Sequence, residues 1–161
     1  MKRNGIACAA TGLLVSLAAT TFSAADKAPS PARTGSSTQA VDAQAEEAFR
    51  KGEEFGEKKK YADALRWYRI AAERGHLESQ NNVGLFLVSG MGGTKDVGEG
   101  IRWLRKAADR GHEVAQRNIG FMYLQGIGVP QDRAEALRWL RKAADQGDEE
   151  AKAGIKMLGG K

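Results

Sequence analysis

The chain has 161 residues, with 25 basic and 20 acidic side chains and a formal net charge of +5. This length supports one modest domain and argues against a multidomain enzyme. The single Cys8 excludes an internal disulfide, and the two histidines form no cluster with zinc-ligand spacing. The composition therefore favours a binding domain, and we expect neither a metal nor a cofactor.

Residues 1–25 have the features of a secretory signal peptide. Two basic residues precede an apolar run over 6–22, and the segment closes with the small residues Ser23 and Ala25. A retained membrane anchor is the alternative, but the run is short and is diluted by glycine, serine and threonine. We predict export, with the bacterial periplasm as the preferred destination and the extracellular space as the alternative. We expect no stable membrane span once the leader is removed.

Removal of this leader lowers the net charge. The leader carries two basic and no acidic residues, so 23 bases then face 20 acids, and +5 falls to +3. A charge this small gives little attraction for nucleic acid, and we expect no nucleic-acid partner. Residues 26–41 are rich in proline, serine, threonine, glycine and alanine, which bury too little apolar surface to order a chain, and we predict a disordered linker there.

An internal repeat of 36 residues dominates the remaining sequence. It aligns the tryptophans Trp67, Trp103 and Trp139, the glycines Gly75, Gly111 and Gly147, the glycines Gly84 and Gly120, and three double alanines. The eight residues from Arg102 to Asp109 recur unchanged from Arg138 to Asp145. A fixed period in this range is the signature of a solenoid of stacked units.

Each unit is predicted to contain two helices. Most apolar residues of 62–74 fall on one arc of a helix, Gly75 suits a left-handed helix end, and a second helix is expected over 77–88. Asp96 with Glu99 has capping-box spacing at the start of the next unit. This pattern predicts about seven helices in all. They are divided among four segments: an N-terminal partial repeat over 42–60, full repeats over 61–96 and 97–132, and a truncated repeat over 133–161.

The repeat resembles a known family. Tryptophan, a double alanine and a glycine, followed by the run from Gly120 to Asp132 with its Val129-Pro130 pair, are similar to the Sel-one-like repeat, a relative of the tetratricopeptide repeat. The resemblance implies an all-α, right-handed solenoid of antiparallel helix pairs. It also implies a concave surface lined by the first helix of each pair, and a role as an adaptor for other proteins.

The polar arc of the first predicted helix in each unit carries the candidate partner-binding residues. They form rows one repeat apart, namely Arg66, Arg102 and Arg138; Arg69, Arg105 and Arg141; and Lys106 and Lys142. Guanidinium groups suit carboxylates, so an acidic protein or peptide segment is the predicted partner. The alternative is mutual neutralisation, because acidic residues stand three positions before one row and four after another.

Other sites and functions are less well supported. His76 and His112 follow the helix-ending glycines and are interpreted as helix caps rather than metal ligands. We predict a non-catalytic protein-binding scaffold of the cell envelope. One alternative is a binder of an anionic envelope polymer or lipid surface. The other is a secreted β-lactamase-like hydrolase, although this sequence lacks the S-x-x-K motif of such enzymes. The predicted last helix has no capping unit after it, so end-to-end association is an open expectation.

Overall fold

The computed structural model describes residues 36–159, with side chains from Ala43 onward, and this part of the chain contains only helices. They are α1 (Ser36–Glu57), α2 (Tyr61–Glu73), α3 (Leu77–Ser89), α4 (Val97–Asp109), α5 (Glu113–Gln125), α6 (Arg133–Asp145) and α7 (Glu149–Met157). The predicted leader lies outside the described residues. Helix α1 begins inside the range expected to be linker, because alanine, glutamine and glutamate, all good helix formers, predominate from Gln39 onward.

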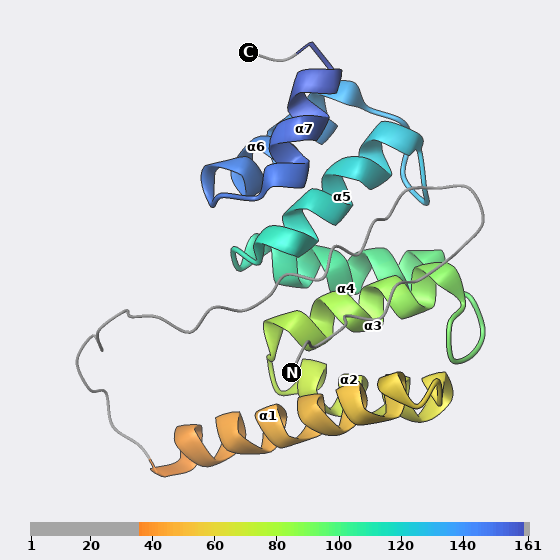
Figure 1. Cartoon of the computed structure of the whole chain (residues 1–161), viewed down its shortest axis with the longest axis vertical. Helices are drawn as coiled ribbons and strands as arrows, with labels where there is room; N and C mark the ends of the chain where they lie inside the picture. The colour runs from red at the N-terminus through yellow and green to blue at the C-terminus, as the bar shows by residue number, and fades with distance from the viewer. Residues whose placement is uncertain (1–35, 160–161) are drawn as a thin grey trace.

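The helices stack in chain order, with α1 at one end and α6 and α7 at the other (Figure 1). Extensive contacts join only helices that are consecutive in the chain, and the closest pairs are α1 with α2, α3 with α4, and α5 with α6. The predicted all-α solenoid is therefore confirmed. No helix among the described residues combines the length and apolar character that a membrane crossing requires.

Glycines allow the closest helix pairs to approach. A Cβ on Gly84 would lie 2.5 Å from Leu104 of α4, and one on Gly120 would lie 2.8 Å from Leu140 of α6. Gly52 of α1 would meet Tyr68 of α2 at 2.5 Å in the same way. Any side chain here would force the helices apart, so these positions set the packing distance within each pair.

The helix ends follow the sequence pattern. Gly75, Gly111 and Gly147 have φ values of +92°, +93° and +106°, a conformation that favours glycine. Asp96 accepts a hydrogen bond from the Glu99 backbone N–H at 2.8 Å, which confirms the predicted cap. The turn from α1 to α2 has three residues, whereas the equivalent turns from α3 to α4 and from α5 to α6 have seven each. No side chain caps α2.

The repeated tryptophans pack between helices in every unit. Trp67 and Trp103 are half-buried against one apolar cluster, which includes Ala72 and Val83. Trp139 is buried in the next cluster, with Ala108 and Ile119. The indoles therefore serve primarily to join successive units.

Candidate functional site

The structure places the predicted cation rows on α2, α4 and α6. Seven of the eight side chains are solvent-exposed, and Arg69 is half-buried. The exposed fraction of the side chain reaches 81% for Arg66 and 64% for Arg138. We refer to these eight residues below as the cation rows.

Two lysines of the rows are held by their own tryptophans. The Lys106 ammonium lies 4.9 Å from the centroid of the Trp103 ring, and the Lys142 ammonium lies 4.1 Å from that of Trp139. Attraction between an ammonium and the negative face of an indole stabilises such a pair by about 0.5–1 kcal/mol at exposed sites. The same geometry at two positions one repeat apart presents cations at a constant step.

Two arginines of the rows have an acidic partner within their own helix. Arg66 lies 3.6 Å from Asp63 and Arg138 lies 3.0 Å from Glu135, both within one helix. Exposed pairs of this kind contribute no more than about 1 kcal/mol. They leave these arginines available to a stronger carboxylate partner.

Arg69 makes a contact between repeats that the sequence did not reveal. It donates to both carboxylate oxygens of Glu99, at 2.8 and 3.1 Å, and Glu99 also accepts from Trp103 Nε1 at 3.1 Å. Both donors keep Glu99 ionised, and the pKa of its carboxyl is lowered, first by the hydrogen bond from Arg69. The predicted capping box is therefore only half formed, because the Glu99 carboxylate turns to Arg69.

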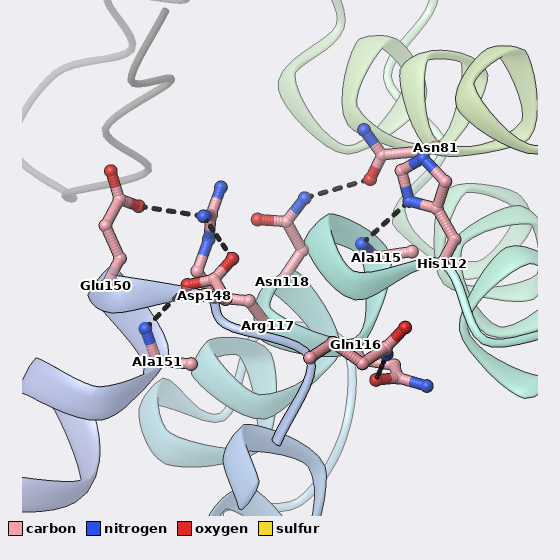
Figure 2. Close-up of polar contacts among 10 residues, drawn as sticks. Asn81, His112, Ala115, Gln116, Arg117, Asn118, Asp148, Glu150 and Ala151 are labelled. Atoms are coloured by element: carbon pink, nitrogen blue, oxygen red, sulfur yellow. Dashed lines mark hydrogen bonds and ion pairs between the residues drawn. The ribbon is translucent and has the colours of Figure 1, made fainter. Parts of the chain in front are cut away.

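A row of buried polar side chains joins α3, α5 and α7 (Figure 2). Asn118 donates to Asn81 Oδ1 at 2.9 Å. Arg117 lies 2.6 Å from Asp148 and 3.3 Å from Glu150. These residues were not predicted from the sequence, although asparagine and arginine at inward helix positions are a signal that could have identified them. The pairing satisfies polar groups whose burial would otherwise cost free energy.

The two histidines cap helices, as predicted. His76 Nδ1 accepts from the Ser79 backbone N–H, and His112 Nδ1 accepts from that of Ala115, both at 3.2 Å. An accepting Nδ1 requires a neutral ring. Burial, followed by the charges of His76 and Arg117, lowers the pKa of His112 to about 4. No group of metal-binding side chains gathers in the described part of the chain.

Comparison with known proteins identifies the family. The model of the Sel1 repeat matches three successive segments, residues 42–76, 77–112 and 114–148, which make up more than half of the chain. The chain belongs to the Sel1 repeat family. No match was found among curated proteins.

Solved structures give the same result. A Sel1 repeat protein from Oxalobacter formigenes is 35% identical with a TM-score of 0.69, over 74% of this chain and 50% of that one. The protective antigen c5321 of uropathogenic Escherichia coli, which displays an SLR fold, is 32% identical with a TM-score of 0.62, over 71% of this chain and 25% of that one. This chain thus spans half or less of these two relatives.

A more distant structure shares the fold alone. The Helicobacter pylori cysteine rich protein B is 19% identical with a TM-score of 0.55, over 75% of this chain and 98% of that one. The likeness concerns the helical fold. At this identity it carries no statement about activity.

The matched segments shift the repeat boundaries from those expected. Each Sel1 repeat begins with α1, α3 or α5 and ends with α2, α4 or α6. The most extensive helix contacts follow the same pairing. The cation rows therefore lie on the second helix of each repeat, and the expectation that they line the concave surface no longer follows from the resemblance. A periodic pattern fixes the length of a unit without fixing where the unit starts.

Proposed function

We propose that this Sel1 repeat protein is an exported, non-catalytic scaffold that holds an acidic segment of a partner protein against the cation rows. Sel1 repeats are in general protein-interaction scaffolds, which gives the class of function. The observation that supports the cation rows as the binding face is the pair of lysine–tryptophan contacts on α4 and α6. They hold exposed cations in the same position of successive repeats.

The arrangement supports binding by repetition. Each exposed arginine or lysine contributes a modest contact, but an extended segment with regularly spaced carboxylates would meet several of them at once. Because the stack is stiff, little conformational entropy is lost when the second and third contacts form. The within-helix pairs of Arg66 and Arg138 are weak enough to exchange for such a partner.

Reversal of charge on the rows tests this proposal. The chain is expressed in a bacterium, partners in the extracytoplasmic fraction are crosslinked and captured, and mass spectrometry identifies them. The double variant Arg102→Glu and Arg138→Glu should lose the captured protein while keeping its helicity. Arg50→Glu with Lys95→Glu is the matched control, since it changes the net charge equally at exposed residues outside the rows. Equal capture by both double variants would reject the cation rows as the binding face.

Export is tested separately. N-terminal sequencing of the chain from the extracytoplasmic fraction should begin at Asp26, after removal of residues 1–25. A chain that keeps its first residues and stays in the cytoplasm would reject export without bearing on the binding face.

A further inference from the structure

A hollow of about 340 Å³ opens at one end of the stack, between α6 and α7. It is lined by Arg141, Ala144, Asp145, Lys152 and Ile155. The volume lies at the lower end of the range for ligand pockets, so it suits a single large side chain. The lining combines two apolar side chains with three charged ones, which gives a bound side chain both apolar contact and orientation.

The repeat shows what fills the equivalent hollow elsewhere in the molecule. Ala144 and Ile155 correspond, one repeat earlier, to Ala108 and Ile119. That earlier pair is 1% exposed, in a cluster with Trp139 of the next helix, whereas Ala144 and Ile155 are half-exposed. The groove between α2 and α3 is covered in the same way by Trp103. In the described part of the chain, no tryptophan packs against Ala144 and Ile155.

An arginine that takes part in the contact between α2 and α4 also has a counterpart at the groove between α6 and α7. Where α4 docks on α2, Glu99 pairs with Arg69 and accepts a hydrogen bond from Trp103, which stands four residues later. Arg141 is the counterpart of Arg69 two repeats on. Arg141 forms no ion pair with the side chains of residues 43–159. The open groove therefore offers both an indole site and a free guanidinium.

The intermediate junction explains why Arg141 remains free. Arg105, the counterpart one repeat earlier, donates to the Tyr123 hydroxyl, while Glu135 pairs with Arg138 of its own helix. The position that corresponds to Tyr123 is Gly159, which follows the end of α7 and has no hydroxyl to offer. Arg141 thus has neither of the partners that its counterparts use.

The charge of this end selects among possible occupants. Gly84 and Gly120, which admit the next helix, correspond to Lys156 in α7. A helix docked like α6 would bring the residue equivalent to Leu140 against Lys156, so a carboxylate suits that place better than leucine. In a second copy of this chain, α2 would bring Tyr68 there instead, and Lys51 already lies 4.6 Å from the Trp67 ring. The occupant that fits is a helix of another protein with carboxylates at the places that face Arg141 and Lys156.

We propose that the groove between α6 and α7 binds an amphipathic helix of a partner protein, which places an aromatic side chain in the hollow and a carboxylate, one helical turn before it, on Arg141. The partner helix would contact α6 and α7 in the same way as α4 contacts α2 and α3 within this protein. It is independent of the cation rows, apart from Arg141, which belongs to both.

A designed peptide tests the proposal. The probe has the sequence of residues 132–146 with Leu140→Glu, is stapled into a helix on its outward face, and carries a fluorophore for anisotropy titration with the full chain. Binding should weaken at least tenfold when the peptide carries Trp139→Ala and severalfold when it carries Glu135→Gln. In the protein, Ile155→Lys and Arg141→Glu should each weaken binding at least tenfold, with an unchanged circular dichroism spectrum.

Arg138→Glu in the protein is the matched control, because this exposed residue lies on α6 outside the lining of the hollow. It should leave peptide affinity within twofold, although it disrupts the cation rows. Failure of the probe to bind, or equal losses for Arg138→Glu and Arg141→Glu, would overturn the proposal. So would a dimer of the chain that Ile155→Lys dissociates, because the groove would then belong to a second copy.

Discussion

Arg117 Nη1 lies 2.6 Å from Asp148 Oδ2, and the side chains are only 9% and 4% exposed. Asp148 also caps α7 through Oδ1, which accepts from the Ala151 backbone N–H at 2.7 Å. One carboxylate therefore starts α7 and fastens it to α5 (Figure 2). We predict that Asp148→Ala destabilises the protein by about 3 kcal/mol, since it removes a cap and leaves a buried guanidinium with only Glu150. Urea unfolding measures the loss.

Two variants separate the effects at this junction. Asp148→Asn keeps a good capping residue and removes the charge, so any remaining loss reports the buried pair. The double variant Arg117→Asn with Asp148→His installs the residues found one repeat earlier, Asn81 and His112. It should be more stable than Asp148→Ala. An Asp148→Asn protein as stable as the wild type would show that the pair contributes nothing.

Gly120 is predicted to tolerate no side chain. In Gly120→Ala the new methyl group would lie 2.8 Å from Leu140 and 3.2 Å from the Ala136 carbonyl oxygen. We expect a loss of about 1–3 kcal/mol from overpacking, although alanine is the better helix former. Lys156→Ala at the equivalent position of α7 is the control and should change stability by less than about 0.5 kcal/mol. A thermally stabilised Gly120→Ala protein would refute the close-packing role.

His112 predicts a loss of stability in acid. Its pKa is about 4 in the folded protein, against the ordinary value of 6.5 in the unfolded chain. The unfolded chain therefore binds the proton first as the pH falls, and stability decreases between pH 6.5 and about 4, with no further change from this group below that. At about 1.4 kcal/mol per pKa unit, the loss amounts to roughly 3 kcal/mol.

The measurement is denaturant unfolding across this pH range, with NMR titration of the His112 ring. His112→Asn keeps a capping side chain without titration, so its stability should depend less on pH over the same interval. A ring that titrates near 6.5 in the folded protein would contradict the buried, neutral state required by the cap.

Glu99 is predicted to contribute more to the stability of the folded protein than its repeat counterpart Glu135. Glu99→Gln should cost about 1–2 kcal/mol because the bidentate contact from Arg69 of the preceding repeat is lost, and it should shift the indole N–H resonance of Trp103. Glu135→Gln, whose pair with Arg138 is local, should cost less than about 1 kcal/mol. Equal losses would indicate that the contact between repeats has no special weight.

The sequence predicted the helices well because each boundary carries its own chemical signal. The helix expected over 77–88 is observed as Leu77–Ser89, between a histidine cap and the left-handed Gly90. Gly75 and its counterparts end helices for the same local reason. Such signals act over a few residues and can be recognised without knowledge of the fold.

Contacts between units could not be predicted in the same way. Arg69 and Glu99 are 30 residues apart, and whether they meet depends on the rotation between successive repeats, which the period alone does not specify. Arg117 and Asp148 pose the same difficulty across 31 residues. The candidate binding residues lie within helices, as expected, but the partners of these side chains became visible only in the structure, and the start of each repeat came from the family match.

The restriction of extensive contacts to consecutive helices bears on how this protein is made. A hairpin such as α3 with α4 makes its most extensive contacts within itself, and α5 and α6 then cover the remaining apolar face of α4. Low contact order is associated with folding in microseconds to milliseconds. Translation proceeds at only about 5–20 residues per second. Each hairpin therefore has ample time to fold on the preceding one while the next is still being synthesised, so growth of the nascent chain and growth of the stack proceed in the same direction.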